Sequence, residues 1–168
     1  MPATPSTGLV WKEVRNQMFA VLGFVSGRGE ARTAGIVYAV HGNELFVGTD
    51  RNSWKARHIT ANPNVSLTVT IAKRIPFMPF VKIPPATITF QGRAAICSLD
   101  DVSLEVRHAL FRGLELKAEE RERICVIRVA PAGEFVTYGV GVPLLTMRNP
   151  EQARGRAPVA PAGGPTSP

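Results

Sequence analysis

The residues with the clearest chemical potential lie where an apolar strand pattern gives way to a helical one. Thr49, Ser53 and Lys55 follow one another closely at this junction. A strand that feeds a helix gathers unpaired backbone N–H groups, a hydroxyl, an ammonium and the positive end of the helix dipole, which together favour a phosphate group. A purely structural interpretation stays open, in which Asp50 or Asn52 caps an exposed helix and Lys55 is solvated.

Other catalytic patterns are absent from the sequence. Gly27 and Gly29 form a G-x-G, but Arg32 stands where a dinucleotide fingerprint needs its third glycine, and the context is a hairpin. There is no G-x-x-x-x-G-K-[ST] loop, and Ser26 is one residue out of register for a nucleophile elbow. The histidines fall in a predicted turn and in two different helices: His41, His58 and His108. We therefore assign no catalytic residue.

The composition describes one globular domain. The chain has 168 residues, of which 45% are hydrophobic and 20% charged. It lacks both the roughly 18 consecutive apolar residues of a membrane span and the pattern of a secretory signal, which predicts a soluble cytoplasmic protein. Cys97 and Cys125 lie far apart, without a second Cys or His at metal-ligand spacing. We expect buried thiols, with neither a metal site nor a disulfide.

The charge balance favours an anionic partner without identifying it. The formal net charge is +7, and nucleic acid, a phosphorylated small molecule and a membrane surface are all compatible with it. Aromatic residues make up only 7% of the chain, and no basic run is interleaved with Phe or Tyr as a stacking surface. We therefore expect no nucleic-acid partner.

Hydrophobic patterning predicts a strand-rich fold with two or three helices. Helices are expected over residues 7–16, 51–62 and 99–114, and strands over 18–26, 31–40, 45–49, 65–71, 85–97, 124–130 and 135–140. The first three strands form an antiparallel meander with Gly-bearing turns, and the last two form a pair. Because no βαβ alternation occurs, the layout favours a mostly antiparallel barrel over a doubly wound sheet.

Three segments stand apart from this body, which spans residues 7–148. Residues 1–6 and 149–168 are rich in Pro, Ala and Gly, so we expect both ends to be mobile. Residues 75–85 are apolar but contain four prolines. That segment could be a lid over an apolar ligand, a dimer contact, a membrane contact, or a hairpin connection tucked against the core. Of these, a membrane contact is the least favoured.

Four stretches carry a resemblance to a known family. They are Arg32-Thr33-Ala34-Gly35-Ile36-Val37-Tyr38, Glu44-Leu45-Phe46-Val47-Gly48-Thr49, Ser53-Trp54-Lys55-Ala56-Arg57 and Asn62-Pro63-Asn64-Val65-Ser66-Leu67. The sequence resembles the pyridoxamine 5'-phosphate oxidase-like split β-barrel family, which includes flavin- and deazaflavin-dependent oxidoreductases of actinobacteria. The resemblance is continuous over residues 19–67 and extends, by order of elements, to about residue 140.

The resemblance implies a cofactor site and a homodimer with the cofactor at its interface. The residues that it places at FMN are Thr33, Ala34, Gly35, Ile36 and Val37 along the ring and ribityl chain, Thr49 beside the ring or phosphate, Ser53, Trp54 and Lys55 at the phosphate, and Gln91 approaching the flavin. Gln91 and residues 138–145 would serve the site of the partner subunit.

The implied activity is hydride transfer to or from an unsaturated organic substrate, with FMN or the deazaflavin coenzyme F-420 as cofactor. FMN is favoured because the motif matches the wider superfamily, whereas a basic groove would favour the acidic tail of the deazaflavin. Residues that could form such a groove are Arg51, Arg57, Lys73 and Arg74. The alternative is a non-catalytic flavin or haem carrier, or a regulator, on the same barrel.

One departure from the family bears on the substrate. True pyridoxamine phosphate oxidases have an arginine-rich strand at the C-terminus. In this chain, residues 138–143 are followed instead by the expected mobile tail. We therefore expect no oxidation of vitamin B6.

Overall fold

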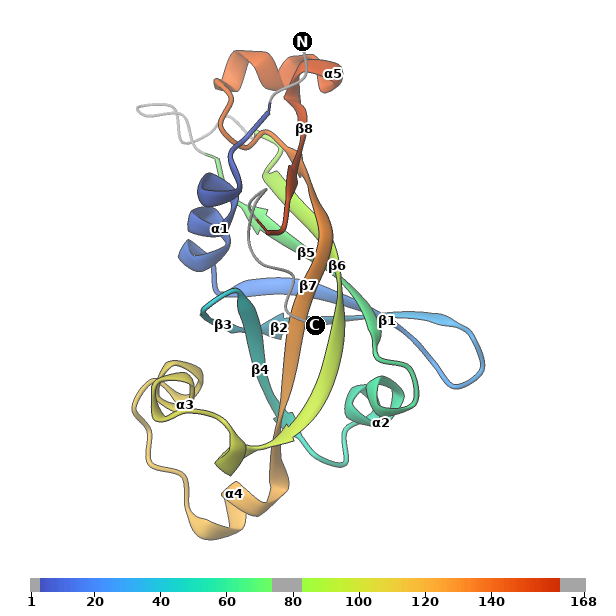
Figure 1. Ribbon diagram of the computed structural model, residues 1–168, viewed down its shortest axis with the longest axis vertical. Helices are drawn as coiled ribbons and strands as arrows, with labels where there is room; N and C mark the ends of the chain where they lie inside the picture. The colour runs from blue at the N-terminus through green and yellow to red at the C-terminus, as the bar shows by residue number, and fades with distance from the viewer. Residues whose placement is uncertain (1–3, 74–82, 161–168) are drawn as a thin grey trace.

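The computed structural model describes residues 4–73 and 83–160, and one antiparallel sheet dominates it (Figure 1). Its eight strands run in the order β2-β1-β5-β6-β7-β4-β3, with β8 added to β7. The strands are β1 (Phe19–Val25), β2 (Ala31–Val37), β3 (Ala39–His41), β4 (Glu44–Asp50), β5 (Asn64–Ile71), β6 (Ala86–Ser98), β7 (Ile124–Tyr138) and β8 (Arg154–Pro158).

Among the described residues, five α-helices and two short 3-10 helices surround this sheet. They are α1 (Thr7–Asn16), α2 (Trp54–Ala61), η1 (Leu99–Asp101), α3 (Leu104–Phe111), α4 (Ala118–Arg123), η2 (Leu144–Arg148) and α5 (Pro150–Ala153). In Figure 1, α1, α5 and β8 lie at one end of the molecule, and α3 and α4 at the other. No helix within residues 4–73 and 83–160 is long and apolar enough to cross a membrane.

The sheet rolls up because its two ends are consecutive in the chain. β2 lies at one end of the strand order and β3 at the other, and Tyr38 alone separates them. The backbone N–H of Tyr38 donates to the carbonyl of Met18 at 3.0 Å, and its buried phenol donates to the carbonyl of Val14 at 2.7 Å. Tyr38 therefore holds the bend that closes the barrel.

Strand alternation fills the barrel with apolar side chains. Leu22, Leu67 and Ile88 come from neighbouring strands and are fully buried in one core. The indole of Trp11 on α1 meets the ring of Phe135 edge-on at 5.3 Å, so α1 covers one end of this core.

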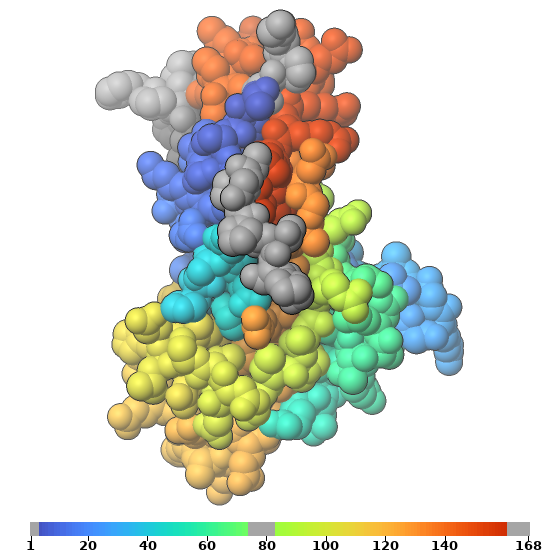
Figure 2. Space-filling model, in the orientation of Figure 1, coloured from blue at the N-terminus to red at the C-terminus, as the bar shows by residue number. Residues whose placement is uncertain are grey.

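A second, smaller core lies on the outer face of β4 and β7. It joins Phe46 and Val126 of these strands to Leu99, Val102 and Val106 of the segment that contains η1 and α3. Together with α4, that segment forms a cap over this face, here called the α3–α4 cap (residues 99–123). The cap makes up the lower end of the molecule in Figure 2.

The predicted antiparallel split barrel is confirmed, whereas several element boundaries differ. The expected helix over 99–114 is interrupted, because Val102 is extended and Ser103 starts α3 as its N-cap. The two strands expected over 124–130 and 135–140 form the single strand β7. The expected meander is divided, since β2 pairs with β1 while β3 pairs with β4 at the far end of the sheet.

The expected mobile tail from residue 149 is the largest difference. α5 and β8 occupy residues 150–158, and β8 pairs with β7 along its length. Ala157 and Val159 join the core, and the indole N–H of Trp11 donates to the carbonyl of Val159 at 3.1 Å. Small residues at alternate positions pair closely with β7, so this strand forms without the large apolar side chains by which strands are usually recognised. At the other end, Ser6 caps α1 by accepting from the Leu9 N–H.

Two expectations concern residues that the structure does not describe. Residues 75–82 of the proline-containing segment and Arg74 of the possible basic groove lie outside the described residues, as do residues 1–3 and 161–168.

Candidate cofactor site

The strand-to-helix junction is built around the hydroxyl of Ser53. This residue, and not Asp50 or Asn52, is the N-cap of α2, and its Oγ accepts from the N–H of Ala56 at 3.3 Å. Thr49 Oγ1 lies 3.3 Å from the same oxygen. The backbone N–H of Ala56 is thus bound to the Ser53 hydroxyl, and that of Arg57 donates to the Ser53 carbonyl. In the first turn of α2, the N–H groups of Trp54 and Lys55 are therefore the two left for a ligand.

Asp50 organises the turn that precedes this cap. Its carboxylate accepts from the backbone N–H of Asn52 at 2.7 Å and pairs with Arg123 at 3.3 Å. The hydrogen bond from Asn52, together with the nearby charges of Arg123 and Lys55, lowers the pKa of Asp50 below its ordinary value. The junction thus combines one ionised carboxylate, held by its own turn, with free amides and a lysine that face an anion favourably.

A second group of predicted residues shares the outer face of the barrel. Pairing register aligns Thr33, Gly23, Ser66 and Gln91 in one row across β2, β1, β5 and β6. Thr33 and Gln91 thus lie three strand spacings, or about 14 Å, apart on the same side of the sheet. The next row along the strands contains Gly35, Val21, Thr68, Thr89 and Val136.

Two glycines, Gly23 and Gly35, place no side chain on this face. A Cβ at Gly23 would lie 2.6 Å from Ser66 Oγ, and a Cβ at Gly35 would lie 3.1 Å from the ring of Phe19. The Ser66 hydroxyl and the ring of Phe19 therefore fill the space beside these two glycines. A planar ligand on this face would meet that hydroxyl and that aromatic ring, and not the bare backbone.

The structure divides the five residues predicted on β2. Thr33, Gly35 and Val37 are exposed on the outer face, whereas Ile36 is buried and Ala34 packs against the core. Alternation along a strand explains the division. Ala34 and Ile36 can therefore meet a ligand only through their backbone.

One aromatic contact joins the junction to β1. The ring of Trp54, at the start of α2, lies 5.2 Å from the ring of Phe24 on β1. Phe24 pairs across the strands with Arg32, the residue before Thr33. Trp54 is 44% exposed. Because Phe24 is buried in the core and alternates with Gly23 along β1, its ring lies on the opposite side of the sheet from Thr33.

Ser66, Thr68 and Thr89 belong to the same face and were absent from the predicted set. Thr68 Oγ1 and Thr89 Oγ1 lie 3.2 Å apart, so these hydroxyls form a polar strip between β2 and Gln91. The alternation of Ser66 and Thr68 with buried Val65 and Leu67 is visible in the sequence. What the sequence lacks is the register that aligns this strip with Gly35.

The C-terminal strand adds arginines to this surface. Arg156 of β8 pairs with Val136 and so extends the row that begins at Gly35, while its guanidinium pairs with Glu134 at 3.0 Å. Arg154 is the other exposed arginine of this strand. The segment expected to be a mobile tail thus includes a strand with two arginines, and the expectation that the protein does not oxidise vitamin B6 stays a prediction.

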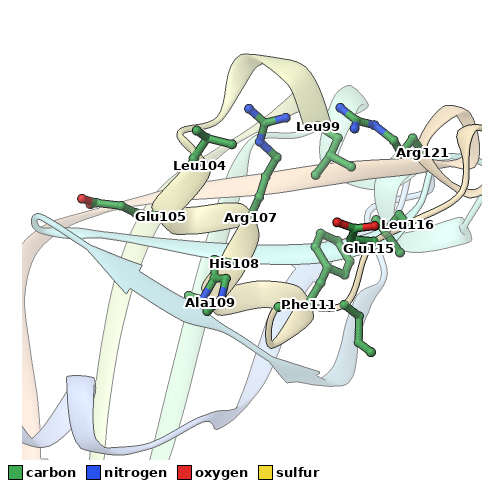
Figure 3. Close-up of a pocket in the computed structure, with 12 residues that line it drawn as sticks. Leu99, Leu104, Glu105, Arg107, His108, Ala109, Phe111, Glu115, Leu116 and Arg121 are labelled. Atoms are coloured by element: carbon green, nitrogen blue, oxygen red, sulfur yellow. The ribbon is translucent and has the colours of Figure 1, made fainter.

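A pocket of about 870 Å³ lies elsewhere, against the α3–α4 cap, and none of the predicted cofactor residues lines it (Figure 3). Of the two thiols, Cys125 lies on β7 opposite Thr49, one of the predicted site residues. Cys97 packs against the small core of the cap, and burial raises the pKa of both Cys97 and Cys125.

Comparison with solved structures finds the same fold at low sequence identity. An F-420 reductase matches at 19% identity with a TM-score of 0.54, covering 74% of this chain and 93% of its own. A candidate pyridoxamine 5'-phosphate oxidase from Listeria innocua matches at 14% identity with a TM-score of 0.58. The match covers 74% of this chain and 92% of the Listeria chain. A haem storage protein from Vibrio cholerae matches at 18% identity with a TM-score of 0.57. The match covers 82% of this chain and 98% of the Vibrio chain.

The sequence itself matches no protein-family model and no curated protein. The strand order, the register and these structural matches therefore bear on the fold alone. On that evidence, the chain has the split β-barrel fold of pyridoxamine 5'-phosphate oxidase-like proteins.

Proposed function

We propose that this protein is an oxidoreductase that binds FMN, with the deazaflavin coenzyme F-420 as the alternative, on the outer face of β2, β1, β5 and β6. The alignment of Thr33, Gly35 and Gln91 on one face carries this proposal. The face fits a planar ring, and the junction fits the phosphate at its end. The F-420 reductase among the structural neighbours supports the same class of cofactor.

The protein contributes binding and orientation in this proposal, while the cofactor supplies the hydride chemistry. Lys55 and the amides at the start of α2 hold the phosphate, and Thr49 fixes the position of the Ser53 hydroxyl. The half-exposed ring of Phe19, which lies beside Gly35, offers the cofactor ring an apolar surface. Thr68, Thr89 and Gln91 offer hydrogen bonds along the face, and an unsaturated organic substrate binds against the exposed side of the ring.

A second copy of the chain completes the site. The outer face is open, and three apolar residues at its edge are about half exposed: Met18 at 53%, Phe19 at 48% and Val37 at 57%. A homodimer that covers this edge would exclude water from the ring, and Gln91 with residues 138–145 would then face the site of the partner.

A non-catalytic carrier on the same barrel is the second candidate. The haem storage protein, which has the same fold and a similar TM-score, favours it. The absorption spectrum of the purified protein, mass spectrometry of what dissociates from it, and titration of the stripped protein with FMN, F-420 and haem separate the candidates. Tight binding of FMN or F-420, and reoxidation of the bound cofactor by an unsaturated substrate after it has been reduced with dithionite, supports the enzyme. Binding of haem alone would replace it with the carrier.

The phosphate assignment has its own test. Lys55→Ala combined with Ser53→Ala is expected to weaken FMN binding by about tenfold or more, because charge-assisted hydrogen bonds to phosphate are lost. Lys12→Ala, an exposed lysine on α1, is the matched control and should leave the affinity unchanged. Equal FMN affinity in the double variant and the control would contradict the assignment.

A further inference from the structure

The pocket on the α3–α4 cap is a candidate site that the proposed cofactor does not use. Its volume of about 870 Å³ falls in the range of small-molecule sites. Its walls are mostly apolar, with two arginines among the charged residues: Leu99, Leu104, Ala109, Phe111, Leu114 and Leu116, with Arg107 and Arg121. Figure 3 shows these side chains around one opening beside α3.

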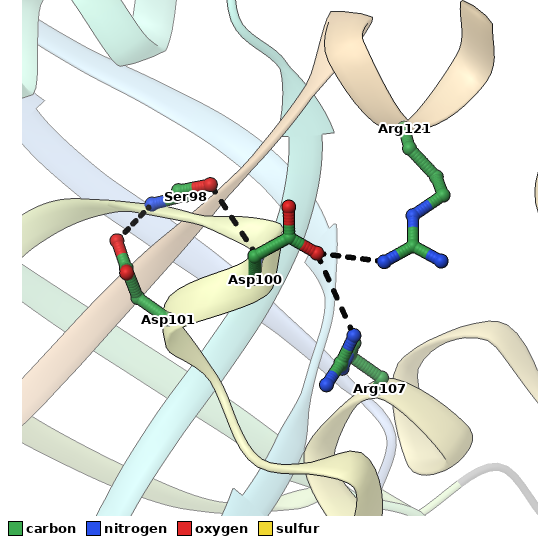
Figure 4. A network of polar contacts seen from close by, with 5 residues as sticks. All are labelled: Ser98, Asp100, Asp101, Arg107 and Arg121. Carbon is green, nitrogen blue, oxygen red and sulfur yellow. Dashed lines mark hydrogen bonds and ion pairs between the residues drawn. The ribbon is translucent and has the colours of Figure 1, made fainter. Parts of the chain in front are cut away.

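Arg107 lacks the hydrogen bonds that a largely buried guanidinium needs. Its side chain is 26% exposed, and its Nε is shielded from solvent without a partner among the described residues. Its Nη1 lies 3.6 Å from Asp100 Oδ1, beyond hydrogen-bond distance (Figure 4). That oxygen already accepts from Arg121 at 2.6 Å. Two cations thus share one carboxylate, and Arg107 still has donors to offer an anion.

Two leucine side chains that line the pocket are largely exposed to solvent. Leu104 is 74% and Leu114 75% exposed, one on α3 and the other on the loop that follows it. Both line the pocket with Phe111, whose ring packs on the far side against the backbone of β4 at Gly48. Apolar surface of this kind is stabilised by an apolar ligand.

The acidic residues of the pocket leave the arginine side open. Glu105 pairs with His41 at 3.3 Å and points away from Arg107 in Figure 3. Glu115 also lines the pocket, and Figure 3 draws its carboxylate between Leu99 and Phe111, so an anionic group is favoured where Arg107 and Arg121 are closer than Glu115. The site thus has a cationic end and an apolar wall.

We propose that this pocket binds a small amphipathic carboxylate, with its carboxylate on Arg107 and Arg121 and its apolar tail along Leu104, Phe111 and Leu114. The terminal nitrogens of Arg107 donate to the carboxylate of the ligand. Arg107 then no longer competes with Arg121 for the carboxylate of Asp100. This site is separate from the outer face of the barrel, so it stands whether or not the protein binds a flavin.

Calorimetric titration of the full chain with octanoate, 1-octanol and acetate tests the proposal. Octanoate is expected to bind saturably at one site per chain. Octanol lacks the charge and acetate lacks the tail, so both should bind at least about tenfold more weakly. Octanoate binding that is absent, or no tighter than that of octanol, would overturn the proposal.

Variants locate the site. Arg107→Gln should weaken octanoate binding by about tenfold, because it removes a charge-assisted contact. Arg112→Gln removes a charge from the same cap, but Arg112 contacts Met18 and does not line the pocket, so it should have no effect. Leu104→Asn alters a side chain that is mostly exposed, so the fold should tolerate it, and it should weaken octanoate binding several-fold. Unchanged affinity in Leu104→Asn would place octanoate elsewhere and refute the proposal, even if Arg107→Gln failed to fold.

Discussion

The Ser53 hydroxyl both caps a helix and faces the proposed phosphate. Its oxygen accepts from Ala56 and lies within hydrogen-bond distance of Thr49 Oγ1. Removing it costs capping energy of about 1 kcal/mol in addition to any contact with a ligand. Lys55 has no capping role, so the Lys55→Ala single variant reports on the phosphate more cleanly than Ser53→Ala does.

The ionised state of Asp50 gives the junction a defined pH dependence. Its pKa is lowered in the folded protein, first by the N–H of Asn52 and then by Arg123. Ionisation therefore stabilises the fold above the unfolded-state pKa of about 4, and this contribution is lost as the pH falls through the lower folded value. The difference in unfolding free energy between the wild type and Asp50→Asn should be constant from pH 7 to pH 5 and shrink below about pH 4. Urea denaturation across this range measures it, and a difference that grows toward low pH would contradict the assignment.

At the scale of elements, Gly92 shows what close strand pairing requires. A Cβ there would lie 2.7 Å from the carbonyl oxygen of Ala130 on β7. Because backbone cannot move aside as a side chain can, Gly92→Ala should lower the unfolding free energy by about 2 kcal/mol. Gly27→Ala is the control, since a Cβ at Gly27 meets nothing within 4 Å, and its effect should stay within about 0.5 kcal/mol. Urea unfolding compares the two, and equal midpoints would refute the close approach.

The strand β8 should contribute a substantial share of the stability. A chain that ends at residue 149 loses the burial of Ala157 and Val159 and the bond from Trp11, which together are worth about 3 kcal/mol or more. A chain that ends at residue 160 keeps all of these contacts and is the control. The shift in the urea midpoint between the two chains is the measurement. Equal stability would mean that β8 is not part of the folded unit.

Sequence patterns located individual strands better than they predicted which strands pair with each other. Apolar alternation located β1, β5 and β6, because side chains on one face of a strand share one environment. It could not predict that β2 and β3 would part at Tyr38, since the bend depends on contacts with Val14 and Met18. The same limit applies to the site: the family resemblance implied Thr33 and Gln91 separately, while their common row follows from pairing through β1 and β5.

At the scale of the whole molecule, the half-exposed edge at Met18, Phe19 and Val37 predicts association. Val37→Lys should convert a dimer into a monomer and release the cofactor, because a buried unpaired charge opposes contact with the second copy. Leu114→Lys changes an even more exposed residue, at 75%, on the α3–α4 cap and should leave both properties intact. Sedimentation velocity with absorbance of bound cofactor measures both. A wild-type monomer that binds FMN tightly would refute the shared site.

Tyr38 links the two ends of the strand order, so neither edge of the barrel can fray alone. Loosening of β2 pulls on the same peptide that holds β3, and loosening of β3 removes the anchor of the strand beneath the proposed cofactor. The two edges therefore form one cooperative unit of local unfolding, although they lie at opposite ends of the hydrogen-bonded order. Their amide protons should exchange with solvent as a single kinetic group, and a cofactor that orders β2 should slow the exchange of β3 as well.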